Sequence, residues 1–117
     1  DRADTGIGGS SLGGLISLQV LREASGTFGK CMCMSPTLGW NDEEAIRWLE
    51  QEDTAWLSDT KLWIDMGTKE GSSQQVQFAN QARIDRAAEL LKNLGLVHGK
   101  EYQAKKYQDA LHNEQAW

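Results

Sequence analysis

Four short apolar runs alternate with longer amphipathic segments along the chain. Each run is about five residues long and ends at glycine, serine or other polar residues, which is typical of a β-strand. The segments between the runs repeat apolar residues at helical spacing, or begin with residues that favour a helix start, such as Asn41 as an N-cap followed by acidic residues. This pattern predicts strands at 5–9, 30–34, 62–66 and 102–107, and helices at 12–24, 41–49 and 74–94.

The regular order of strand and helix along the whole chain indicates the α/β fold class. Crossovers between successive parallel strands are right-handed and usually helical, so we expect a parallel sheet of about four strands with helices on its faces. No internal repeat and no linker interrupts this alternation. We therefore expect one domain, or one piece of a domain, over residues 1–117.

Composition narrows the classes of function. The chain has 117 residues and a formal net charge of -5, and its basic residues are scattered. Because binding to a phosphate backbone needs clustered Lys and Arg, we expect no nucleic-acid partner. No apolar run approaches the roughly 18 residues that cross a bilayer, so we expect no membrane span. The sequence carries no indication of localisation.

The two cysteines, Cys31 and Cys33, lie in the second predicted strand, where residues two apart face the same way. This spacing gives poor geometry for a disulfide between them. The sequence around them also lacks the further His or Cys residues that a roughly four-ligand metal site needs. We expect buried structural thiols and no metal site.

A serine lies at the sharp turn between the first strand and the first helix. Gly9-Ser10-Ser11-Leu12-Gly13 has the G-x-S-x-G pattern, in the strand–turn–helix context that marks a nucleophilic serine. Small residues at Gly9 and Gly13 are expected to let the strand and helix backbones pass closely. The hydroxyl of Ser11 would then be exposed, with the N–H of Leu12 at the helix start placed to hold an oxyanion.

Glycine-rich turns have other uses, because they also cap helices, pack closely or cradle phosphates. A dinucleotide fingerprint fits less well here, since Ser11 stands where a third glycine would follow Gly6 and Gly8. A phosphate-binding loop would need a Lys-Ser or Lys-Thr pair, and none follows. We therefore expect no cofactor.

Topology provides a partner for this serine. Loops that follow parallel strands meet at one edge of the sheet, and Ser11, Glu70 and His112 all follow predicted strands. The other histidine, His98, precedes the last strand and is expected at the opposite edge. His112 is therefore the predicted general base, although a solvent-exposed loop histidine without this role also fits the pattern.

Three carboxylates are candidates for the acid that orients His112. Glu70 lies in the loop after the third strand, where it can accept a hydrogen bond from the far imidazole nitrogen and fix its tautomer. Asp65 lies in the strand end itself, where a carboxylate more often bonds a neighbouring loop, and Asp109 is the third candidate. We favour Glu70, because the chain order Ser, acid, His is then that of the α/β-hydrolases.

Several stretches together resemble the esterase family of α/β-hydrolases that includes esterase D, S-formylglutathione hydrolase, siderophore esterases, feruloyl esterases and mycolyltransferases. These stretches are 7–14, 34–36 with Trp40, 64–70, and 112–114 with Trp117. The resemblance implies an α/β-hydrolase fold with Ser11 as nucleophile, His112 as base and the acid at Glu70, where many relatives carry Asp. It also implies hydrolysis of a small-molecule ester or thioester through an acyl-enzyme.

The same resemblance implies that the chain is the carboxyl-terminal part of a longer domain, because several strands precede the nucleophile strand in the family fold. A second oxyanion donor would come from that missing part, and the first strand would be an exposed edge that favours self-association. Trp40 is a candidate for lining an acyl or aryl pocket. An acyltransferase, or a non-catalytic relative that acts only in association, are the alternative interpretations.

Overall fold

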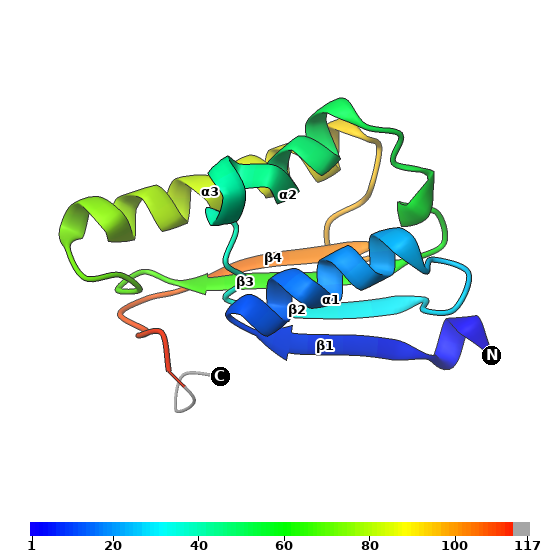
Figure 1. Cartoon of the computed structure of the whole chain (residues 1–117), viewed down its shortest axis with the longest axis horizontal. Helices are drawn as coiled ribbons and strands as arrows, with labels where there is room; N and C mark the ends of the chain where they lie inside the picture. Colours follow the sequence, from blue (N-terminus) through cyan, green and yellow to red (C-terminus); the bar gives the residue numbers. More distant parts are fainter. Residues whose placement is uncertain (114–117) are drawn as a thin grey trace.

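The computed structural model describes residues 1–113 and confirms the predicted alternation of strands and helices (Figure 1). Each predicted helix and strand begins and ends within two residues of its expected limits. In chain order, the elements are η1 (Arg2–Asp4), β1 (Gly6–Ser10), α1 (Leu12–Glu23), β2 (Lys30–Met34), α2 (Trp40–Gln51), η2 (Ala55–Leu57), β3 (Lys61–Gly67), α3 (Gln74–Asn93) and β4 (Tyr102–Tyr107).

The strands form one parallel sheet in the order β1-β2-β3-β4, which confirms the α/β fold class. The carboxyl ends of the strands lie together, since Met34 pairs with both Ser10 and Asp65, and Gly67 pairs with Tyr107. The segments that follow the strands therefore start from the same edge of the sheet, as predicted from the topology.

Within the described residues, the helices lie on one face of the sheet (Figure 1), whereas the sequence pattern did not specify which of its faces they would cover. α1 packs on β1 and β2, while α3 packs on β3 and β4 and contacts α2. Right-handed crossovers explain this layout, because a strand order that never reverses sends every crossover over the same face.

The hydrophobic core lies between the covered face of the sheet and the helices. The strands contribute Cys31, Cys33, Leu62, Ile64, Met66 and Tyr102, and the helices contribute Leu15, Leu18, Leu21, Ile46, Leu49, Ile84 and Leu91. Burying a large apolar side chain contributes roughly 1.5–3 kcal/mol. This layer therefore holds the helices on the sheet and fixes the loops at its carboxyl edge.

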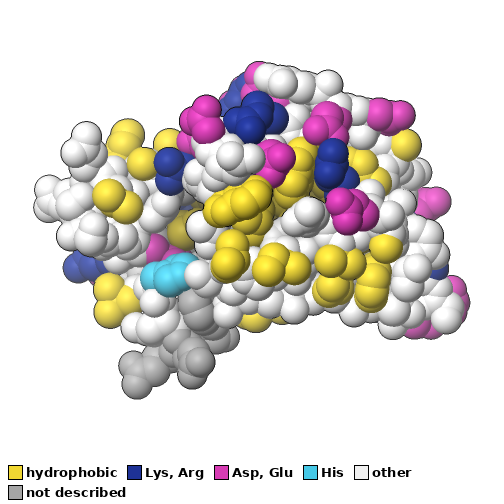
Figure 2. Space-filling model, in the orientation of Figure 1, with side chains coloured by type: hydrophobic (Ala, Val, Ile, Leu, Met, Phe, Trp, Pro, Cys, Tyr) yellow, Lys and Arg dark blue, Asp and Glu magenta, His cyan; other side chains and the backbone are white. Residues whose placement is uncertain are grey.

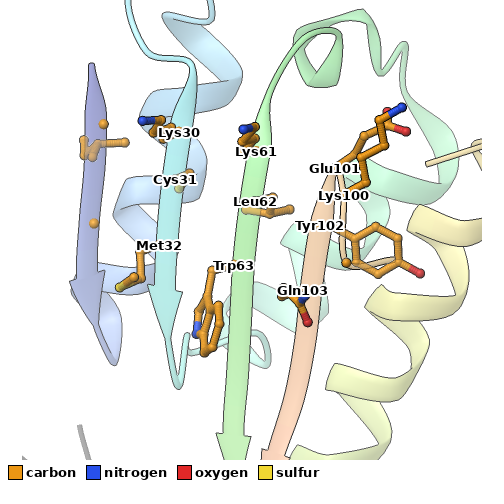
Figure 3. Close-up of a pocket in the computed structure, with 14 residues that line it drawn as sticks. Lys30, Cys31, Met32, Lys61, Leu62, Trp63, Lys100, Glu101, Tyr102 and Gln103 are labelled. Atoms are coloured by element: carbon orange, nitrogen blue, oxygen red, sulfur yellow. The ribbon is translucent and has the colours of Figure 1, made fainter. Parts of the chain in front are cut away.

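The opposite face of the sheet carries no helix within residues 1–113. Met32 is 46% exposed on this face, and the side chains of Trp63 and Gln103 lie on the same side (Figure 3). A cavity of about 530 Å³ lies against the amino-terminal halves of the strands. β1 pairs only with β2, so the edge predicted for the first strand is exposed in the part of the chain that the structure describes.

The start of α2 differs from the prediction, because Asn41 does not cap the helix. Residues 41–43 all have positive φ angles near 50° to 61°, a left-handed turn that Asn and Asp tolerate better than most residues. The guanidinium of Arg47 donates to the carbonyl oxygens of Asn41 and Asp42 and so satisfies this turn. None of the described helices is long and apolar enough to cross a membrane.

Cys31 and Cys33 are buried free thiols, as predicted. Their sulfur atoms lie 3.4 Å apart and share a hydrogen bond. This bond, together with burial, raises the pKa of the Cys33 thiol well above its ordinary value. Burial and this bond therefore favour the neutral form of the Cys33 thiol.

Candidate active site

Ser11 occupies the sharp turn between β1 and α1 with φ 59° and ψ -124°, a strained conformation for a residue other than glycine. Its backbone N–H donates to the carbonyl oxygen of Met34 at 2.9 Å, which ties the turn to the end of β2. Its side chain makes no capping hydrogen bond to α1. The hydroxyl is therefore left to point away from the helix.

Gly9 is the glycine that this turn requires. A Cβ atom at Gly9 would lie 2.7 Å from the carbonyl oxygen of Gly13, which is closer than any stable contact. A Cβ atom at Gly13 would meet nothing within 4 Å among the described residues. The expectation that a small residue is needed is thus confirmed at Gly9 and wrong at Gly13, because the close approach involves the backbone of Gly13 and not its missing side chain.

His112 follows β4 and joins the serine to a carboxylate. Its Nε2 atom lies 2.7 Å from the Ser11 hydroxyl oxygen, and its Nδ1 atom contacts Oε1 of Glu70. The His112 side chain is 41% exposed, whereas the Glu70 side chain is only 2% exposed. The structure therefore brings together the three side chains predicted from the sequence, with the hydroxyl at the open end and the carboxylate at the buried end.

Glu70 is held by donors from the segment after β2, from the end of β3 and from α3. Its Oε2 atom accepts a hydrogen bond from the Ser35 hydroxyl at 2.5 Å and another from the backbone N–H of Gly67. Its backbone carbonyl oxygen accepts from the side-chain amide of Asn80 at 2.8 Å. A buried carboxylate needs such donors, because burial without them costs free energy that favours the neutral acid.

The two other candidate acids lie outside this arrangement. Asp65 accepts from the Ser35 backbone N–H at 2.9 Å and from the Trp63 indole N–H at 2.8 Å, so it bonds a neighbouring loop. Asp109 lies 3.5 Å from the ammonium of Lys69, and both side chains are more than half exposed. Neither carboxylate bonds His112 in the part of the chain that the structure describes.

His98 lies at the opposite edge of the sheet, as predicted. It pairs with Tyr102 at the start of β4, and its Nε2 atom accepts from the backbone N–H of Ala104 at 3.4 Å. Parallel strands place this edge a strand length away from the loops that carry Ser11 and His112.

The remaining predicted site residues, Leu12 and Trp40, open α1 and α2. The Leu12 N–H belongs to the first turn of its helix, where N–H groups lack a partner inside the helix. Trp40 is 49% exposed and does not line the cavity beside Ser11. The Leu12 N–H thus lies at the start of α1, and its role as an oxyanion donor stays a prediction, while Trp40 is not among the residues that line the cavity beside the serine.

A cavity of about 330 Å³ lies beside the serine and histidine. Pro36, Thr37 and Met66 contribute to its walls, together with Ser35 and Asn80, neither of which the sequence analysis assigned to the site. On the same side of the molecule, hydrophobic side chains line the exposed face of α1 (Figure 2), where Leu12 and Ile16 are each about half exposed. The cavity thus has apolar walls around a polar centre.

The hydrogen-bonded side chains of Ser11, His112 and Glu70 are arranged for proton transfer. A hydroxyl bonded to an imidazole, which in turn is bonded to a buried carboxylate, can lose its proton to the imidazole as it attacks an electrophile. No group of three or more His, Cys, Asp or Glu side chains gathers as a metal site within residues 1–113.

A parallel α/β sheet with a serine at such an elbow, facing a histidine and an acid that come later in the chain, defines an α/β-hydrolase. The chain belongs to one family within this class: the family described as "Putative esterase" matches it over residues 1–117. The resemblance inferred from the sequence is thereby confirmed.

Individual proteins give the same picture. The iron(III) salmochelin esterase of Escherichia coli is 32% identical over 101 residues, covering 76% of this chain and 25% of that protein. A ferulic acid esterase structure matches 100% of this chain and 47% of its own, with a TM-score of 0.77 and 18% identity. The structure of an S-formylglutathione hydrolase from Staphylococcus aureus matches 99% of this chain and 47% of the hydrolase chain, with a TM-score of 0.63 and 19% identity.

The two solved structures support the fold alone, because their sequence identity to this chain is too low to support more. The chain spans 25% of the length of the salmochelin esterase and less than half of each structure. The comparisons therefore concern the part of these proteins that corresponds to the present sheet and its loops.

Proposed function

We propose that this protein is a serine esterase in which Ser11 is the nucleophile, His112 the general base and Glu70 the acid that orients the base. The observation that carries the proposal is the continuous hydrogen-bonded chain from the Ser11 hydroxyl through His112 to Glu70. Membership of the esterase family supports ester hydrolysis as the reaction.

The proposed reaction is acyl transfer to water in two halves. His112 takes the Ser11 proton through Nε2 while the serine oxygen attacks the ester carbonyl, and the Leu12 N–H at the positive end of α1 stabilises the oxyanion. His112 then gives this proton to the oxygen of the leaving alcohol as the ester C–O bond breaks, and an acyl-enzyme remains. Water, deprotonated by His112, then attacks the acyl group, and Ser11 recovers its proton as the acid departs.

Glu70 serves this cycle by holding the imidazole. With the Nδ1 hydrogen bonded to Glu70, Nε2 is free to accept the serine proton, and the buried carboxylate stabilises the imidazolium that forms. No metal or cofactor takes part in this scheme.

We propose a small-molecule carboxylic ester or thioester as the substrate. The names of the similar proteins point to this class, since they include a salmochelin esterase, a ferulic acid esterase and an S-formylglutathione hydrolase. The apolar walls contributed by Pro36 and Met66 suit an acyl or aryl group beside the scissile bond.

We further propose that residues 1–117 form part of a larger esterase domain, because the proteins they match are at least twice as long. A second oxyanion donor would then come from outside this chain. Loss of one such donor typically lowers turnover by about 10²- to 10³-fold, so the full-length protein is the material for kinetic experiments.

The test is turnover of an activated aryl ester by Ser11→Ala in the full-length protein. We expect a loss of about 10³-fold or more, because the nucleophile is removed while binding is retained. Ser10→Ala is the matched control, since it removes the neighbouring hydroxyl at the end of β1 and is expected to keep turnover within a few-fold of wild type. Near-normal turnover by Ser11→Ala would refute the proposal.

Product analysis with competing alcohols distinguishes a hydrolase, which transfers the acyl group to water, from an acyltransferase, which transfers it to an alcohol. A hydrolase releases the free acid even when an alcohol is present, whereas an acyltransferase forms the new ester preferentially. We expect the free acid to dominate.

A further inference from the structure

We propose that Ser35 is a positioning residue of the proposed esterase site, acting through Glu70. This inference rests on the proposed function. Its basis is the hydrogen bond from the Ser35 hydroxyl to Oε2 of Glu70, at 2.5 Å, between two side chains that belong to residues each 2% exposed.

The two oxygens of Glu70 have separate tasks. Oε1 faces His112, while Oε2 accepts from the Ser35 hydroxyl and from the Gly67 N–H. Two donors on one oxygen fix the plane of the carboxylate and therefore the direction in which the other oxygen points. Of these two donors, the Ser35 hydroxyl belongs to a side chain, so it is the one that a substitution can remove.

Ser35 itself is held in an unusual backbone conformation. It follows β2 with φ 46°, in the left-handed region that residues other than glycine seldom adopt. Its N–H donates to Asp65, whose other carboxylate oxygen accepts from Trp63. Asp65 is the partner of Met34 in the sheet, so this carboxylate ties the turn after β2 to the end of β3.

The two buried carboxylates, Asp65 and Glu70, thus have different roles. Asp65 fixes the backbone of Ser35, and the Ser35 hydroxyl then fixes Glu70. Without that hydroxyl, the buried Glu70 carboxylate loses a donor and its Oε1 loses a fixed direction toward Nδ1 of His112. The imidazole would then spend less time in the orientation that accepts the Ser11 proton.

The experiment compares Ser35→Ala with wild type in the full-length protein, with an activated ester as the probe. Because the variant removes a hydrogen bond to a charged group, kcat should fall by roughly ten- to a hundredfold, with KM within about twofold. Ser17→Ala is the matched control, since Ser17 is also a buried serine but its hydroxyl bonds the Gly13 carbonyl in α1. It should leave kcat within about twofold.

A double-mutant cycle with Ser35→Ala and Glu70→Ala distinguishes a positioning role of Ser35 from a general effect on protein structure. If Ser35 acts through Glu70, Ser35→Ala should lower kcat no further when Glu70→Ala is already present. A further drop as large as in the wild-type background would overturn the proposal, as would an unchanged kcat in Ser35→Ala alone.

Ser35→Gly keeps the test decisive if Ser35→Ala folds poorly. Glycine adopts φ 46° without strain, so this variant removes the hydroxyl and relaxes the backbone. We expect the same fall in kcat, together with a shift of the downfield proton resonance of the His112 Nδ1–H. Loss of turnover in Ser11→Ala combined with full turnover in both Ser35 variants would reject this inference alone, whereas retained turnover in Ser11→Ala would reject the proposed function.

Discussion

At the scale of single residues, the site combines groups of very different exposure. The His112 side chain is partly exposed and Ser11 lines the cavity beside it, whereas Glu70 is buried and accepts hydrogen bonds from protein donors. In the proposed mechanism, the exposed end would meet the ester, and the enclosure of Glu70 would keep water away from the carboxylate that orients His112.

Replacing Glu70 tests which carboxylate serves the histidine. We expect Glu70→Ala to lower kcat by about 10²- to 10⁴-fold, because the imidazole loses the partner that fixes its tautomer. Asp109→Ala is the control, since Asp109 is an exposed carboxylate two residues after β4 and is expected to change kcat less than about twofold. A larger loss in Asp109→Ala than in Glu70→Ala would reverse the assignment.

Ser11, Glu70 and His112 could be predicted from the sequence because each follows a strand and parallel strands bring such loops together. The role of Ser35 could not. That role depends on the positive φ of Ser35 and on the register of β2 against β3, and neither can be predicted from the residue types. Trp40 also follows β2, yet it is not among the residues that line the cavity beside the serine.

At the scale of elements, β1 and α1 approach each other closely at the Ser11 turn. Both elements could be predicted correctly, since glycine between an apolar strand and an amphipathic helix is a strong signal. The prediction failed at the start of α2, where Asn41 is part of a left-handed turn and not an N-cap. The side chain of Asn permits both uses, so local sequence does not decide between them.

Gly9→Ala and Gly13→Ala form a matched pair at this crossing. The Cβ of alanine at position 9 would collide with the Gly13 carbonyl, so we expect the free energy of unfolding to fall by about 1–3 kcal/mol. Alanine at position 13 has open space and favours the helix, so stability should hold or rise by up to about 1 kcal/mol. Denaturant unfolding measures both, and equal losses in the two variants would contradict the close approach of the two backbones.

At the scale of the whole molecule, the uncovered face of the sheet is the feature that the sequence pattern described least well. Alternation of strands and helices predicts a parallel sheet, but which face a helix covers depends on strand order, which is a long-range property. The order β1-β2-β3-β4 leaves Met32 and Trp63 on a face without helices in the described residues, next to the free edge of β1.

We expect the isolated chain of residues 1–117 to self-associate through this face and edge, because exposed apolar sheet surface and an unpaired edge both favour pairing between chains. Size-exclusion chromatography with light scattering should find oligomers whose share rises with concentration. Met32→Lys should lower that share, whereas Leu94→Lys, at an exposed apolar residue beyond the end of α3, should not. A monodisperse monomer at all concentrations would contradict the expectation.

The proposed activation of Ser11 by His112 is tested most directly by the site of covalent labelling in the full-length protein. A fluorophosphonate probe reacts with an activated serine, so peptide mapping by mass spectrometry should locate one adduct on Ser11, formed much more slowly in His112→Ala. An adduct on another residue, or none on Ser11 in protein shown to be folded, would contradict the claim that Ser11 is activated by His112.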